Sequence, residues 1–294
     1  MRRLRTPMFA YALLLPAFAS TAFLIAYPLY LVLSMSVREG RSMTLSRIGE
    51  LPLGFANYAR VLSDPATWHS LRVTLAYVVL AVGPAFVLGL ALALILNQRF
   101  PARRWLRSLV LLPWAVPGVV VSIAFLWMLD ASFGVVNYLL RTVGLISRDI
   151  AWFASGDTAL AAVIIPTVWK GYPFFTLMLL AALQAIPNEY YEAARVDGAS
   201  RWQQFRFITW PGIQGTAVLA LILNGLWAFR EFDIIFATTG GGPARATQTL
   251  ALRVYNEAFA HFQLGLASTL GVFMLALGGL VIVVAYRVIR REYF

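Results

Sequence analysis

The sequence predicts an all-α integral membrane protein with six transmembrane helices. Hydrophobic residues make up 60% of the 294 residues and charged residues only 13%, whereas soluble domains average about half and about a quarter. Apolar runs long enough to cross ~30 Å of hydrocarbon recur along the chain. The short alternating segments of a membrane β-barrel are not seen. A soluble protein with an unusually large core explains this composition less well.

Each predicted span holds the ~20 mainly apolar residues that a membrane-crossing helix needs. The six spans are 11–35, 72–97, 108–129, 158–183, 214–237 and 264–288. The first follows a basic N-terminus, as a secretory signal would, but its apolar run is too long and lacks a clear small-residue cleavage site. We therefore predict an uncleaved first span and one transmembrane domain over 1–294.

The arginines predict that both termini lie in the cytoplasm. The ten-residue segment 98–107 alone carries four arginines, and others lie near both termini and in the loop 184–213. The predicted outer loops hold nine arginines over much longer stretches. Basic residues concentrate on the cytoplasmic side of membrane proteins. This bias also explains the net charge of +11 without nucleic acid as a partner.

The polar loop 184–213 between spans four and five carries signals for two short helices. Asn188 is placed to cap the first helix, and Gly198 stands where a left-handed residue ends it. Ser200 and Gln203 have the spacing of a capping box for the second helix. A passive linker needs no caps, so we expect the loop to hold a fixed shape. An amphipathic hairpin lying on the lipid surface remains the alternative.

This loop resembles the signature of binding-protein-dependent ABC importer permeases. The resemblance is carried by Glu192, Ala193, Ala194, Gly198, Ile208 and Pro211. Trp210 departs from the pattern, since the family usually has Leu before the proline, and we expect altered packing there rather than lost coupling. The motifs TTGGGP at 238–243, LLPWAVPGVV in span three and FANY before span two resemble the sugar-importer branch of the MalF-like type.

The resemblance implies the type I ABC importer permease fold in a bacterial cytoplasmic (inner) membrane. It implies a coupling helix that docks on an ATPase subunit through Glu192, Ala193, Ala194, Arg195, Asp197 and Gly198. The implied partners are a second, non-identical permease, two ATPase subunits and an extracytoplasmic solute-binding protein that delivers a carbohydrate. ATP and Mg²⁺ would be bound by the ATPase subunits, and this chain would hold no cofactor.

The chain lacks the motifs of an enzyme. Its one lysine, Lys170, is followed by Gly171, so a phosphate-binding Gly-Lys-Ser/Thr loop is absent. The two histidines, His69 and His261, are far apart, and there is no cysteine. We predict no catalytic residue and no metal site, and expect energy to come from a partner.

Polar residues within spans four and five are candidates for a substrate path, because charges inside a membrane are costly. Asn224, Ala228 and Glu231 have the i, i+4, i+7 spacing of one helical face, with Trp227 beside it. Polar groups suit sugar hydroxyls, and an aromatic ring suits the apolar face of a sugar.

The resemblance adds residues of span four at the same height. The complete predicted path is Lys170, Gly171, Phe174, Asn224, Trp227, Ala228 and Glu231. A static ion pair between Lys170 and either Glu231 or Asp233 is an alternative. If Lys170 and Arg230 are unpaired, an anionic sugar is a further possibility.

The segments 36–70, 130–157 and 238–263 are expected on the outer face, where they suit a binding-protein docking surface or an interfacial lid. Two other functions compete with the importer. A secondary transporter should show internal repeats and a charged midplane site, and no repeat is evident. A membrane enzyme should show a metal or acid–base constellation. The sequence leaves open which carbohydrate is carried and whether the ATPase is dedicated.

Overall fold

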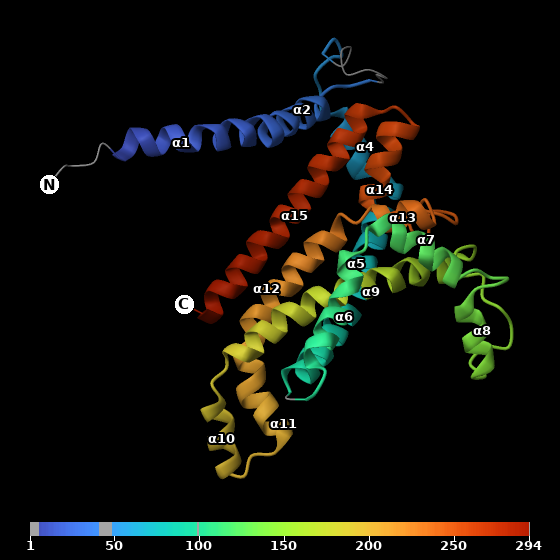
Figure 1. The fold of residues 1–294 in the computed structure, drawn as a ribbon. Helices are drawn as coiled ribbons and strands as arrows, with labels where there is room; N and C mark the ends of the chain where they lie inside the picture. The colour runs from blue at the N-terminus through green and yellow to red at the C-terminus, as the bar shows by residue number, and fades with distance from the viewer. Residues whose placement is uncertain (1–5, 41–48, 99, 294) are drawn as a thin grey trace. The chain divides into compact units, whose positions relative to one another are not determined.

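The computed structural model describes residues 6–40, 49–98 and 100–293 (Figure 1). Within these ranges the secondary structure is helical, apart from an isolated antiparallel bridge between Arg38 and Leu53. The predicted all-α class is confirmed. The chain divides into two compact units, one formed by 1–67 with 253–277 and the other by 68–252 with 278–294.

Helices follow one another along the chain, and three π-helical turns (η) interrupt or extend them within the described ranges. In order they are α1 (Thr6–Thr21), η1 (Ala22–Ala26), α2 (Tyr27–Ser36), α4 (Ala56–Ser63), α5 (Pro65–Asn97), α6 (Arg103–Ala115), α7 (Gly118–Met128), α8 (Val135–Thr142), α9 (Gly156–Ala185), α10 (Asn188–Val196), α11 (Arg201–Gln204), η2 (Phe205–Thr209), α12 (Trp210–Phe229), α13 (Asp233–Thr238), α14 (Leu250–Tyr255), η3 (Asn256–Ala260) and α15 (Leu264–Tyr293).

Five helical segments among the described residues are long and apolar enough to cross a membrane. They are Leu13–Ser36, Pro65–Asn97, Gly156–Ala185, Arg201–Phe229 and Leu264–Val284. These segments overlap the first, second, fourth, fifth and sixth predicted spans. A sixth crossing arises if α6 and α7 are counted together.

The third predicted span is not a continuous helix, so the prediction for 108–129 was wrong in this respect. α6 and α7 meet at an angle of 95°. Val116 between them is extended, with φ −77° and ψ 130°. Pro117 explains the break, because proline has no backbone N–H to donate and disfavours a helical conformation in the residue before it.

The fifth predicted span, 214–237, also divides in two. α12 ends at Phe229, Arg230 is its C-cap, and α13 begins at Asp233. Three of the four residues 230–233 are charged, and charged side chains in a continuous span are costly. Ending the helix lets one of these carboxylates serve as a hydrogen-bond acceptor for the next helix.

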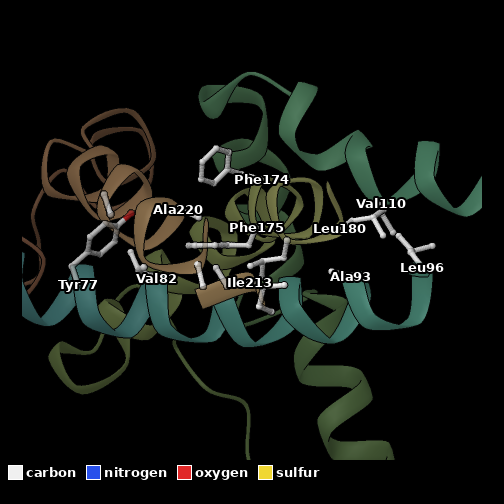
Figure 2. Close-up of a cluster of buried hydrophobic side chains, with 14 of the residues drawn as sticks. Tyr77, Val82, Ala93, Leu96, Val110, Phe174, Phe175, Leu180, Ile213 and Ala220 are labelled. Atoms are coloured by element: carbon white, nitrogen blue, oxygen red, sulfur yellow. The ribbon is translucent and has the colours of Figure 1, made fainter. Parts of the chain in front are cut away.

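The core of the second unit lies where α5, α9 and α12 pack together, with α6 against α9. Figure 2 shows Tyr77, Val110, Phe175 and Ile213 among the side chains that meet there. Gly89 permits the close approach of α5 to α9, since a Cβ at this position would lie 2.4 Å from the Cβ of Phe175. Phe175 is fully buried, and Phe→Ala at such a site costs roughly 3–5 kcal/mol.

In the first unit, the end of α2 packs against the start of α15. Thr269 Oγ1 donates a hydrogen bond to the Ser36 carbonyl at 3.0 Å. Gly265 lies close to the Arg38 carbonyl, since a Cβ at residue 265 would be 2.7 Å from that carbonyl oxygen. A small apolar cluster that includes Val61 and Leu270 completes the packing.

Candidate functional site

The loop that follows α9 has the fixed shape that its caps predict. Gly198 adopts the left-handed φ of +78°. Its N–H donates to the Arg195 carbonyl at 3.1 Å, and the Ala199 N–H donates to the Ala194 carbonyl at 2.8 Å. This pair of bonds is a Schellman motif, which satisfies the last carbonyls of a helix. The prediction that Gly198 ends the first loop helix is confirmed.

The second helix signal is also confirmed, whereas the first N-cap is displaced by one residue. The Ser200 hydroxyl accepts from the Gln203 N–H, and the Gln203 side chain accepts from the Ser200 N–H, a complete capping box. Asn188, predicted as the N-cap, is instead the first residue of α10. Pro187 precedes it as the N-cap and makes no side-chain capping bond. A proline leading into the helix fixes its direction without a cap.

A side-chain hydrogen bond connects α10 to the last residue of η2, directly before α12. The Tyr191 hydroxyl lies 3.0 Å from Thr209 Oγ1. A cavity of about 660 Å³ separates α10 from η2 and α12, and Ala193, Ala194 and Asp197 are among its lining residues. The other predicted coupling residues, Glu192, Arg195 and Gly198, are exposed.

Large apolar side chains are exposed on the same loop. Val196 is 89% exposed and Trp202 68%, and Tyr190 and Phe207 are exposed as well. Exposed apolar side chains on this loop are available for contact with another protein. The loop therefore combines a fixed shape with exposed apolar side chains.

A second candidate site lies between α9 and α12. All seven predicted path residues line one cavity of about 150 Å³: Lys170, Gly171, Phe174, Asn224, Trp227, Ala228 and Glu231. The sequence analysis missed three other lining residues, Trp114, Thr167 and Ile234. Trp114 stands between two prolines in a motif already noted, and that aromatic position is the signal that could have identified it.

The cavity has an aromatic side and a polar side. The rings of Phe174 and Trp227 meet edge to face, with centroids 4.8 Å apart. Gly171 faces Asn224, whose amide nitrogen would lie 3.8 Å from a Cβ at residue 171. Thr167 is fixed by the buried Tyr77, whose hydroxyl lies 2.6 Å from Thr167 Oγ1.

Lys170 contacts the break between α6 and α7. Its Nζ donates to the Val116 carbonyl at 2.7 Å and lies 3.5 Å from the Trp114 carbonyl. Both carbonyls belong to the segment where the helical hydrogen-bond ladder is interrupted. Within the described part of the chain, Lys170 forms no ion pair with Glu231 or Asp233.

Glu231 lines the cavity from outside α12. The expectation that Asn224, Ala228 and Glu231 share one continuous helical face was wrong for Glu231, because α12 ends two residues earlier. Glu231 Oε1 instead accepts from the Ile234 N–H at 3.2 Å, in the first turn of α13. A carboxylate stabilises the N-terminal end of a helix in this way. No group of three or more potential metal ligands gathers among the described residues.

The several long apolar helices of the described residues define a multi-pass integral membrane protein. Residues 85–293 match the family model described as binding-protein-dependent transport system inner membrane component. The chain belongs to this family, which confirms the predicted resemblance.

Named relatives resemble the chain over most of its length. It is 39% identical to the trehalose/maltose transport system permease protein MalF of Thermococcus litoralis, over 82% of this chain and 81% of the relative. It is 36% identical to the sulfoquinovosyl glycerol transport system permease protein SmoG of Agrobacterium fabrum, over 97% and 91%. A chain of a bacterial ABC transporter for the acidic polysaccharide alginate shares the fold, with a TM-score of 0.84, 23% identity and coverage of 98% and 96%.

Proposed function

We propose that this inner-membrane protein forms half of the translocation path for a carbohydrate in an ATP-driven ABC importer. The observation that carries the proposal is the gathering of the seven path residues around one cavity between α9 and α12. The edge-to-face pair of Phe174 and Trp227 offers apolar surface for a sugar ring. Asn224 offers both a donor and an acceptor for hydroxyls.

The size of the cavity supports a shared path. A cavity of about 150 Å³ is smaller than the ~300–1,000 Å³ of a typical ligand pocket. A second, non-identical permease of similar fold would complete the site from the opposite side. Each chain would then supply part of the sugar contacts.

The loop supports docking on an ATPase. A capped α10 moves as a unit, whereas an unstructured loop would absorb the displacement that ATP binding produces. Val196 and Trp202 supply apolar contact area, and the exposed Glu192 and Arg195 supply polar contacts at its edge. Two ATPase subunits would bind the ATP and Mg²⁺, one for each permease, and both termini of this chain would lie on the same cytoplasmic side.

The substrates named for the relatives support a carbohydrate. Trehalose or maltose is neutral, whereas sulfoquinovosyl glycerol and alginate are anionic. An extracytoplasmic solute-binding protein would deliver the substrate, as a periplasmic protein that carries an alginate pentasaccharide binds the alginate transporter. Lys170 lines the cavity and keeps its positive charge, because the carbonyls that accept its hydrogen bonds are neutral, so the proposal includes anionic sugars as well as neutral ones.

Reconstitution tests this function. The chain, its second permease, the ATPase and the binding protein are placed in proteoliposomes, and ATP-dependent uptake of a panel of labelled saccharides and sugar acids is measured. We expect uptake that requires both ATP and the binding protein. The secondary-transporter alternative predicts uptake by the chain alone, driven by an ion gradient, and that result would overturn the proposal.

A further inference from the structure

Three arginines of α6, Arg103, Arg104 and Arg107, line a polar cavity of about 810 Å³. Residues of α10 line the same cavity. Arg103 and Arg107 lie one helical turn apart on α6. In its hydrogen-bonding orientation, Gln184 Oε1 accepts from Nη2 of Arg103 at 2.9 Å and from Nη2 of Arg107 at 2.5 Å. Two guanidinium groups therefore converge on one neutral oxygen, and Arg104 adds a third charge to the lining.

The positive charge of this cavity is not compensated within the described part of the chain. Its lining residues there include no Asp or Glu. The Nε atoms of Arg103 and Arg107 are buried and have no hydrogen-bond partner among the described residues. The arginines also occupy the first turns of α6, the positive end of its dipole, and the N-cap Ala102 offers no capping side chain. A cavity lined by positive charges attracts anions.

An apolar groove continues from the basic cavity. A second cavity of about 170 Å³ shares Arg107 and Gln184 with the first and is lined mainly by apolar side chains, including Val110 and Leu180. A basic pocket that leads into an apolar groove fits an amphipathic molecule, with an anionic head and a hydrocarbon chain.

The height of the cavity along α6 fits the surface of the bilayer. Trp105, next to the arginines, is 76% exposed, and Leu109 and Leu112 are exposed further along the helix. Tryptophan concentrates at the level of lipid headgroups, and basic pockets between transmembrane helices are suited to anionic lipids.

We propose that Arg103 and Arg107 bind the phosphate of an anionic phospholipid, whose acyl chain lies in the groove along α6 and α9. The lining residues of this site are different from those of the cavity proposed for the carbohydrate. It contacts Asn188 and Tyr191 of α10, so a bound lipid touches the loop proposed to couple to the ATPase.

Native mass spectrometry of the full-length chain in its purified complex tests the lipid site. The protein is titrated with phosphatidylglycerol or phosphatidylcholine, and the apparent affinity of each is measured. Substituting both Arg103→Gln and Arg107→Gln should weaken phosphatidylglycerol binding by about twenty-five-fold, about fivefold for each arginine. Arg206→Gln, an exposed loop arginine outside the cavity, should change it by less than about twofold.

Further variants separate recognition from folding. The pair Arg103→Lys and Arg107→Lys keeps both charges and should retain most of the binding. Gln184→Leu removes the neutral acceptor and should retain it too. Loss of binding in Gln184→Leu together with a lowered melting temperature would mean that the arginines serve only the fold.

Three other outcomes overturn the proposal. Equal affinity for phosphatidylcholine and phosphatidylglycerol would exclude recognition of the anionic headgroup. Displacement of the lipid by equimolar inorganic phosphate would indicate a free-anion site. Binding to the isolated chain but not to the complex would indicate that a partner subunit fills the cavity.

Discussion

Lys170 Nζ lies 2.7 Å from the carbonyl oxygen of Val116, 54 residues away, and so the single lysine of the chain stabilises the break between α6 and α7. An unsatisfied carbonyl inside a membrane is costly, because no water is available to replace the lost donor. The lysine also lines the cavity proposed for the carbohydrate. The same side chain therefore contributes to the wall of the cavity and donates to a carbonyl at the helix break.

Lys170→Met should destabilise the protein by roughly 1.5–3 kcal/mol, the range for a hydrogen bond to a charged donor. Lys170→Gln retains an N–H donor and should cost less. Thermal unfolding of the purified complex measures both. Equal melting temperatures for wild type and Lys170→Met would show that the Val116 carbonyl does not depend on this donor.

Glu231→Gln and Glu231→Ala separate the helix cap from the charge. Glutamine keeps an oxygen that can accept from the Ile234 N–H, so stability should stay close to wild type, whereas alanine loses the acceptor. If Glu231 contacts substrate, both variants should weaken substrate binding by roughly 0.5–3 kcal/mol. They should also alter the preference among sugars. Uptake assays with a saccharide panel measure this effect.

Asn224→Ala should weaken uptake through the same cavity without changing basal ATPase activity, by roughly 0.5–1.5 kcal/mol for a lost hydrogen bond. Gln214→Ala is the matched control, since Gln214 is a partly exposed polar residue of α12 that does not line the cavity. Indistinguishable uptake and sugar preference in Asn224→Ala and Gln214→Ala would remove Asn224 from the path.

Gly198→Pro should uncouple transport while the protein still inserts. Proline cannot adopt the φ of +78° and has no N–H for the Arg195 carbonyl. Gly198→Ala should be milder, at about 1–2 kcal/mol for a left-handed alanine. Gly225→Ala is the control, because this glycine lies within α12 with open space around its Cβ position. Binding-protein-stimulated ATPase activity is the readout.

Glu192→Lys tests the docking face without altering the backbone. It reverses an exposed charge on α10 and should reduce the stimulated ATPase activity while leaving the melting temperature of the isolated chain unchanged. If stimulation and uptake stay normal in both Glu192→Lys and Gly198→Pro, α10 is not the coupling element.

The absence of native cysteine allows the orientation to be tested with single introduced cysteines. Ser200→Cys on the α10–α11 loop should react with an impermeant maleimide only from the cytoplasmic side. Leu145→Cys, at an exposed position before α9, should react only from outside, since the 30-residue α9 separates the two loops. Labelling in the opposite sense would reverse the topology.

Asp64 should make the first unit sensitive to acid. Burial alone raises the pKa of Asp64, but the hydrogen bonds from Arg253 and the Ala66 N–H, with the charges of Arg253 and Arg60, outweigh it and lower the pKa below its usual value. The carboxylate therefore stabilises the fold above the usual pKa of ~3.9, and this contribution is lost as the pH falls through the lower pKa of the folded state.

Asp64→Asn isolates this charge, since asparagine can still accept from the Ala66 N–H. The variant should have a lower melting temperature than wild type at about pH 7, and the difference should shrink towards about pH 3. A difference that does not change with pH would assign the effect to packing rather than to charge.

Local interactions explain why part of this protein follows from its sequence. An apolar run of ~20 residues is a transmembrane helix in almost any context, because the bilayer leaves the backbone no other way to satisfy its hydrogen bonds. Gly198, Ser200 and Gln203 define the loop through bonds to residues fewer than six positions away. The gathering of the path residues could be anticipated only with the help of a family resemblance.

Tertiary structure decided the features that depend on distant partners. The Val116 carbonyl at the break before Pro117 finds its donor in Lys170 from another helix, and Glu231 lies outside its predicted helical face and accepts from the first turn of α13. Arg103 and Arg107 meet Gln184 about eighty positions along the chain. Helical periodicity predicts which residues share a face. It does not predict which neighbouring helix supplies a hydrogen-bond donor or acceptor. Only the packed chain determines whether a polar side chain there binds backbone, substrate or lipid.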